Sequence, residues 1–134
     1  MSATAMEELR LPLAKPTSYP VAAGEVLIEG ELAYLDRGYL TSNPPPGCFN
    51  LFAGIVRRTV GNTAGKAGDC QAYVWTEGDA EVDTAGAVQS WVGNSLQGIS
   101  RCRVAIAGGR VTAGTCIRVL SPTRVVMRLA TLRN

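Results

Sequence analysis

Short β-prone runs separated by glycine and proline are the feature that most constrains the fold of this chain. Such runs recur at spacings near ten residues, which is typical of all-β sandwiches and barrels. Only residues 83–96 could hold a helix, and their β-branched residues and glycines disfavour one. We therefore predict an all-β fold, a single compact β-barrel or β-sandwich with at most one short helix. The predicted strands are residues 25–29, 31–35, 49–60, 71–76, 98–107, 110–112, 115–120 and 124–131.

The length of 134 residues fits one domain, because domains commonly hold about 100 to 200 residues. Residues 1–20 contain Pro12, Pro16 and Pro20 and keep no regular period, so we predict an extended N-terminal arm there. The β domain is then expected over residues 21–134. Its predicted core residues are Val26, Ile28, Leu32, Tyr34, Phe52, Ile55, Val74, Val104, Ile106, Ile117, Val125, Met127 and Leu129.

The chain contains no histidine, which removes the commonest general base and every histidine-ligated metal site. The glycine-rich segment 61–68 lacks the spacing and the Ser or Thr of a phosphate-binding P-loop, so we interpret it as a flexible loop between strands. We expect neither an enzyme nor a cofactor. The four cysteines form no CxxC pair and are expected to be small, mostly buried hydrophobic residues rather than a zinc site: Cys48, Cys70, Cys102 and Cys116.

Four carboxylates alternate along the chain at Glu77, Asp79, Glu81 and Asp83. On a strand they would line one face, close enough to bind calcium or to serve a metal-dependent hydrolase. The glycine and the terminal glutamate of a calcium loop are missing, however. We therefore favour an acidic, solvated edge that faces the arginine-rich half of the chain, and we predict no metal site.

The charges divide sharply along the sequence. All eleven acidic residues lie within residues 1–83, whereas residues 84–134 hold seven arginines and no acid. The two halves could neutralise one another within one fold or between subunits, which we favour because the arginines are spread out. The alternative is a small nucleic-acid-binding β-barrel that uses the arginine-rich half. The arginines are Arg101, Arg103, Arg110, Arg118, Arg124, Arg128 and Arg133.

A weak internal similarity links three tetrapeptides, each at the start of a predicted strand. They are Ala-Gly-Glu-Val at residues 23–26, Ala-Gly-Asp-Cys at 67–70 and Ala-Gly-Thr-Cys at 113–116. Nothing else in the sequence keeps this spacing. We therefore predict no repeat family.

Three stretches of the sequence resemble the small capsid cement, or head decoration, proteins of tailed bacteriophages. They are AGEVLIEGELAYLDRGYL at residues 23–40, FAGIVRRTVGNTAGKAGD at 52–69 and VWTEG at 74–78. These motifs hold 41 of the 134 residues and all lie within residues 23–78, and from about residue 85 onward the likeness is looser. The resemblance implies a structural virion protein, made in the host cytoplasm, that binds the outer surface of the assembled major capsid protein shell. There it would bridge neighbouring capsomers without any cofactor.

The expected partners are the major capsid protein and further copies of the chain, with no nucleic acid. No apolar stretch is long enough for a membrane span. Leu9, Leu11 and Leu13 alternate as in an added edge strand, so we expect the arm to contact the capsid unless it folds back on its own body. The resemblance favours a homotrimer over a dimer. The candidates for its interface are Arg101, Arg103 and Arg118, with Glu77, Asp79 and Glu81 as acidic partners.

Overall fold

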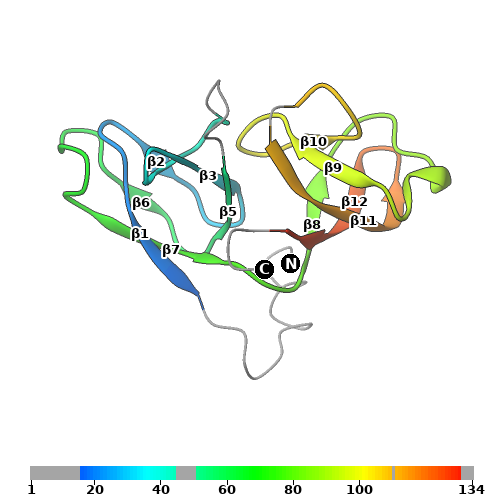
Figure 1. The fold of residues 1–134 in the computed structure, drawn as a ribbon, viewed down its shortest axis with the longest axis horizontal. Helices are drawn as coiled ribbons and strands as arrows, with labels where there is room; N and C mark the ends of the chain where they lie inside the picture. Colours follow the sequence, from blue (N-terminus) through cyan, green and yellow to red (C-terminus); the bar gives the residue numbers. More distant parts are fainter. Residues whose placement is uncertain (1–15, 45–50, 110, 131–134) are drawn as a thin grey trace.

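The computed structural model describes residues 16–44, 51–109 and 111–130. The fold is all-β and sandwich-like, and its sheets do not form a closed barrel. Two five-stranded sheets lie side by side, the first built from the N-terminal half and the second from the C-terminal half (Figure 1). The predicted fold class is therefore confirmed, in its sandwich form.

The first sheet has the strand order β1-β7-β5-β3-β4 and is antiparallel throughout. A parallel bridge between Val21, which follows β1, and Leu40 in β4 brings the two edges of the sheet together, so the sheet curls. A two-stranded ribbon of β2 and β6 lies beside it. The strands are β1 Thr17–Pro20, β2 Val26–Leu27, β3 Leu32–Asp36, β4 Tyr39–Thr41, β5 Leu51–Val56, β6 Val60–Gly61 and β7 Gln71–Trp75.

The second sheet has the order β10-β9-β11-β12-β8 and is also antiparallel. The 3-10 helix η1, Gln89–Trp91, precedes β9 and is the only helical element among the described residues. None of the helical structure described has the length or apolarity to cross a lipid bilayer. The strands are β8 Asp79–Asp83, β9 Ser95–Gly98, β10 Val104–Ala105, β11 Val111–Ser121 and β12 Arg124–Leu129.

Two hydrophobic cores hold the molecule together. One lies within the first half and includes Val21, Leu40, Val56 and Val74. The other belongs mainly to the second sheet but also takes in side chains from the first, so it joins the two halves. Because it combines residues such as Phe52 and Met127, the halves are packed as one body.

Strands β3 and β5 are buried on both faces because each contributes to both cores. In β3, Leu32 and Tyr34 face the second sheet, whereas Ala33 and Leu35 face the core of the first half. Successive side chains of a strand point to opposite faces, so burial on both faces requires an uninterrupted apolar run. The sequences LAYL and FAGIV therefore mark the strands where the two halves meet.

Most of the predicted core residues are buried, and four are not. Ile28 and Ile106 are exposed, whereas Val26 and Ile117 are only half-buried. Ile28 and Ile106 each follow a strand of only two residues, so no regular alternation carries their side chains inward. Ile117 lies at a bulge, where the register of β11 shifts between Cys116 and Arg118.

The predicted strands pair with distant partners or are interrupted. The predicted strands at residues 25–29 and 31–35 do not pair with each other, because β2 pairs with β6 and β3 pairs with β4 and β5. Residues 98–107 do not form one strand, since β9 ends at Gly98 and β10 begins at Val104. Of the possible helix at 83–96, only η1 is present.

The first strand begins at Thr17 and pairs with β7, so the end of the predicted arm belongs to the first sheet. Residues 1–15 lie outside the described residues, and the leucines predicted to bind the capsid are among them: Leu9, Leu11 and Leu13.

Candidate functional site

Strand β8 presents the acidic residues at the edge of the second sheet, next to β12. Arg128 of β12 forms two hydrogen bonds with Asp79, at 2.8 and 3.1 Å from the two carboxylate oxygens. Arg124 of β12 contacts both Glu81, at 3.2 Å, and Asp83. The acidic edge therefore faces the arginine-rich half of the same chain, as the sequence indicated.

These contacts stabilise the charged form of both arginines. Burial by itself lowers the pKa of Arg124, but the hydrogen bonds and charges of Glu81 and Asp83 outweigh burial and raise it. The hydrogen bonds and charge of Asp79 likewise raise the pKa of Arg128. No group of three or more carboxylates or thiols within the described ranges is placed to share a metal ion. The geometry of β8 and β12 is thus that of a cross-strand ion-pair ladder.

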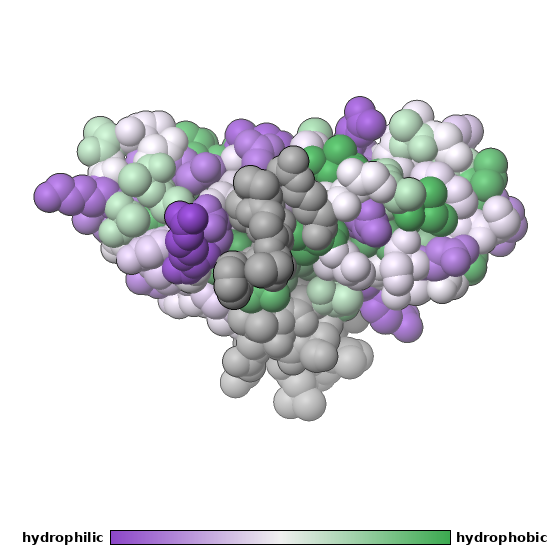
Figure 2. Space-filling model, turned by 45° about the horizontal axis from the view of Figure 1, so that its top comes forward, coloured by the Kyte–Doolittle hydropathy of each residue, from purple (hydrophilic) through white to green (hydrophobic). Residues whose placement is uncertain are grey.

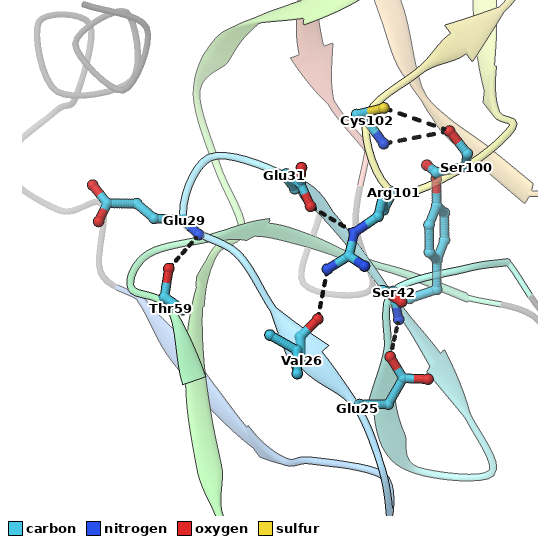
Figure 3. A network of polar contacts seen from close by, with 10 residues as sticks. Glu25, Val26, Glu29, Glu31, Ser42, Thr59, Ser100, Arg101 and Cys102 are labelled. Carbon is cyan, nitrogen blue, oxygen red and sulfur yellow. Dashed lines mark hydrogen bonds and ion pairs between the residues drawn. The ribbon is translucent and has the colours of Figure 1, made fainter. Parts of the chain in front are cut away.

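Arg101 forms a second charged contact, this time between the two halves (Figure 3). Its Nε lies 2.7 Å from Oε1 of Glu31, and its NH2 group donates to the carbonyl of Val26 at 2.6 Å. Its own carbonyl accepts a hydrogen bond from the backbone N–H of Leu32 at 2.8 Å. The loop that follows β9 is therefore fixed to the turn between β2 and β3.

Tyr34 makes a further tie across the same junction. Its hydroxyl donates to the carbonyl of Ser100 at 2.8 Å. Burial, assisted by the nearby Cys102, raises the pKa of Tyr34 well above its usual value, so the phenol stays a neutral donor. A Cβ on Gly98 would lie 2.2 Å from this hydroxyl, so glycine is needed where the ring packs on β9.

The six interface candidates divide into two groups. Arg101, Asp79 and Glu81 are engaged in ion pairs within the chain. Arg103, Arg118 and Glu77 are exposed and form no ion pair with any described residue. The charge complementarity of the two halves is therefore used at least partly inside one chain. Arg103, Arg118 and Glu77 stay candidates for contacts with another molecule.

Residues 62–68 lie between β6 and β7, as predicted for a loop between strands, and Asn62 organises this turn. The Asn62 side chain is buried, and its amide donates to the carbonyls of Val21, Ala22 and Lys66 at 3.0 to 3.3 Å. A Cβ on Gly65 would lie 1.9 Å from Oδ1 of Asn62, so the turn closes tightly on this side chain. Sequence reasoning missed Asn62 because a polar residue in a glycine-rich segment predicts only a turn.

Three of the four cysteines lie among the described residues, all with free thiols. Cys116 is buried, as expected, but Cys70 is half-buried and Cys102 is exposed, so the expectation of buried cysteines holds only in part. A shallow groove of about 180 Å³ beside Cys102 is lined by Glu29, Glu31, Glu81, Asp83 and Arg124, among others. Two of these carboxylates, Glu81 and Asp83, form ion pairs with Arg124.

Replacing Arg101 by alanine is expected to lower the free energy of unfolding by about 1 to 2 kcal/mol. The ion pair with Glu31 is partly exposed and screened, so it contributes about 1 kcal/mol or less, and the lost donor to Val26 adds a similar amount. Urea unfolding, followed by tryptophan fluorescence, would measure the change. Arg118→Ala, at an exposed arginine with no ion pair among the described residues, is the control and should change stability by less than about 0.5 kcal/mol. Equal effects of the two substitutions would contradict a role of Arg101 in joining the halves.

Comparison of the chain with protein-family models, with curated proteins and with solved structures gave no match.

Proposed function

We propose that this chain is a structural virion protein that binds the outer surface of an assembled shell of major capsid protein and stabilises it by bridging capsomers. The observation that carries the proposal is where the family-like motifs lie. All three build one contiguous part of the fold: residues 23–40 supply β2, β3 and most of β4, residues 52–69 supply most of β5 and all of β6, and residues 74–78 include the end of β7. The resemblance therefore follows a structural unit rather than scattered turns.

The physical character of the body supports this role. Both faces of β3 and β5 are buried, and three arginines form ion pairs with carboxylates of the same chain. A protein that braces a shell needs stiffness and defined contact surfaces rather than a reactive site. Many copies on one shell act together, so no single contact has to be strong.

The N-terminal arm is the proposed capsid-binding element. The predicted arm precedes β1 in the sequence, and β1 is an edge strand of the first sheet. An extended arm that leaves from a sheet edge can add to a sheet edge of a partner, with its alternating leucines filling pockets there. Burying Leu9, Leu11 and Leu13 could stabilise the contact by about 1.5 to 3 kcal/mol each before the entropy of ordering is subtracted.

Further copies of the chain are the second proposed partner, in a homotrimer rather than a dimer. Arg103, Arg118 and Glu77 are the charged residues left to contribute, since Arg101, Asp79 and Glu81 are engaged within the chain. Exposed ion pairs contribute about 0 to 1 kcal/mol each, so apolar contact would have to carry most of the association.

Deletion of residues 1–14 tests the role of the arm, because it leaves β1 and its pairing with β7 intact. We expect the thermal midpoint to stay within a few degrees of the wild type, and occupancy on undecorated capsids from the same virus to fall at least tenfold. Substituting Leu9, Leu11 and Leu13 together by serine keeps the arm's length and should reproduce the loss. A large drop in midpoint with occupancy preserved would contradict the proposal and make the arm part of the body's own core.

Binding to single-stranded DNA provides the second measurement. On the face shown in Figure 2, strongly hydrophilic residues lie in separate small groups over both halves rather than in one continuous patch. Arg101, Arg124 and Arg128 are moreover held by carboxylates. We therefore expect no specific binding near physiological salt. Tight binding that weakens steeply with added salt would instead support the nucleic-acid-binding alternative.

A further inference from the structure

The two five-stranded sheets have the same topology. Labelled a to e in chain order, the strands of the first sheet are β1, β3, β4, β5 and β7, and those of the second are β8, β9, β10, β11 and β12. In both sheets the spatial order is a-e-d-b-c, and every neighbouring pair is antiparallel. We infer that the chain is a tandem pair of one structural unit, with residues 17–75 as the first unit and residues 79–129 as the second. We call the outer face of the first unit, which packs against the second unit, the docking surface.

The registers of the two units agree in detail. In each unit, the pairing of strand d with strand b skips one alanine that is followed by glycine, Ala53 before Gly54 and Ala113 before Gly114. A shared strand order could arise from packing alone, whereas a register shift at the same dipeptide is a second, local similarity between the units. The pairs that flank the bulge are Ala33 with Gly54 and Tyr34 with Phe52 in the first unit, and Leu96 with Gly114 and Gln97 with Thr112 in the second.

The glycine of each bulge meets the same atom on strand e. A Cβ on Gly54 would lie 2.1 Å from the carbonyl oxygen of Trp75, and a Cβ on Gly114 would lie 2.2 Å from that of Arg128. The registers of strands d and e place Trp75 and Arg128 at equivalent positions, opposite Ile55 and Thr115 respectively. The end of strand a also makes a parallel bridge to the region of strand c in both units.

The inner faces of the two units are equivalent as well. Six pairs of inward-facing positions that match through the registers are at most 1% exposed in both units. Each curled sheet therefore has apolar residues at the same inward positions. The matched pairs are Ala33 with Leu96, Leu40 with Val104, Ala53 with Ala113, Val56 with Cys116, Ala72 with Val125, and Val74 with Met127.

The outer faces differ, and this difference defines the docking surface. Tyr34, Phe52 and Ile55 of the first unit are buried against the second unit. Their matches in the second unit are Gln97, Thr112 and Thr115, which are polar and half-buried or exposed. An apolar outer face requires a partner, whereas a polar one can face water. The second unit therefore has no apolar outer face on which a third unit could dock.

The repeat is not the one indicated by the three tetrapeptides in the sequence. The segment at residues 113–116 matches residues 53–56 on strand d, not residues 23–26. The connection from strand a to strand b instead carries two positive-φ glycines in each unit, Gly24 and Gly30 in the first and Gly86 and Gly93 in the second. The inference of a tandem pair does not depend on the proposed function.

The outer-face residues of the second unit supply the test. A triple variant of the full chain gives the first unit the polar outer-face residues of the second. Its substitutions are Tyr34→Gln, Phe52→Thr and Ile55→Thr. Amide hydrogen exchange should show protection retained in residues 17–75 and reduced at least tenfold in residues 95–105. The control places polar residues on the inner face, Val56→Thr with Val74→Thr, and should reduce protection in residues 17–75. Equal loss in both units of the outer-face variant would overturn the inference.

Cleavage between the units keeps the test decisive if the triple variant fails to fold. A site for a specific protease, inserted after the exposed Glu77, allows the folded chain to be cut into its two units. We expect the two fragments to co-elute on native size exclusion with an unchanged circular dichroism spectrum, and to separate in denaturant. Loss of β structure on cleavage without denaturant would show that the halves are not two units.

Discussion

Gly54→Ala should reduce the free energy of unfolding by more than about 3 kcal/mol. The added Cβ would lie 2.1 Å from the Trp75 carbonyl oxygen, a backbone atom in a paired strand that cannot rotate away. The φ of Gly54 is +144°, a conformation that residues with a side chain rarely adopt. A steric clash and backbone strain at one buried position together produce effects at the upper end of those seen for single substitutions. Urea unfolding followed by circular dichroism would measure the loss.

Gly61→Ala is the matched control for this substitution. Gly61 is exposed, and a Cβ there meets no atom within 4 Å, so a change of less than about 1 kcal/mol is expected. Gly114→Ala should also destabilise the protein, through the steric clash alone, because its Cβ would meet the Arg128 carbonyl oxygen at 2.2 Å. A stable Gly54→Ala protein with an unchanged unfolding midpoint would show that β5 and β7 are not packed as described.

Asn62→Asp is expected to destabilise the protein by more than about 3 kcal/mol at neutral pH. The substitution keeps the shape of the side chain but replaces an amide that donates to three carbonyl oxygens by a carboxylate that repels them. An uncompensated buried charge costs about 3 to 5 kcal/mol. Thermal unfolding of the variant and the wild type at matched pH would measure the difference.

The effect of Asn62→Asp should depend on pH in a defined direction. Burial and the three carbonyls would raise the pKa of the new carboxyl group above its unfolded value of about 3.9. The folded state then binds more protons than the unfolded state, so stability falls as pH rises above that value. The loss relative to the wild type should be smaller at pH 3 than at pH 7. A loss that is the same at both pH values would contradict the role of the Asn62 amide as donor.

Asn94→Asp is the control, because it makes the same amide-to-carboxylate change at an exposed position. Asn94 is exposed and its amide makes one hydrogen bond, to the carbonyl of Ser90 at 2.9 Å. Water can solvate the new carboxylate there, so we expect a loss below about 1 kcal/mol with little dependence on pH.

The sequence predicted the all-β class and most of the core because these depend on local patterns. Alternation in residues 124–129 identified Val125, Met127 and Leu129 as buried, and all three are. The failures at Ile28 and Ile106 have a different origin, since the ends of short strands are set by pairing with distant residues. No local pattern indicates that β2 pairs with β6 rather than with β3.

The type of charged contact was predictable from the sequence, but the residues that form each contact were not. Alternating carboxylates indicated an edge facing arginines, and β8 and β12 have this arrangement. Which arginine meets which acid depends on register, so Arg101 could not be assigned to Glu31 in advance. The tandem pair was hidden because the matched outer-face residues, such as Phe52 and Thr112, differ in chemistry. Most of the segments that connect the strands also differ in length between the two units, so matched residues do not recur at one constant spacing.

The apolar outer face of the first unit has a consequence during synthesis. Every residue of that unit precedes the second unit in the chain, so the nascent polypeptide can complete the first sheet while the rest is still being translated. At roughly 5 to 20 residues per second, the remaining part of the chain takes on the order of 3 to 10 seconds to emerge. Throughout that interval Leu32, Tyr34, Phe52 and Ile55 have no covering layer. A chaperone that holds exposed apolar surface would find its binding site on the ribosome-bound protein at this face, and would be displaced as Arg101 arrives beside Glu31.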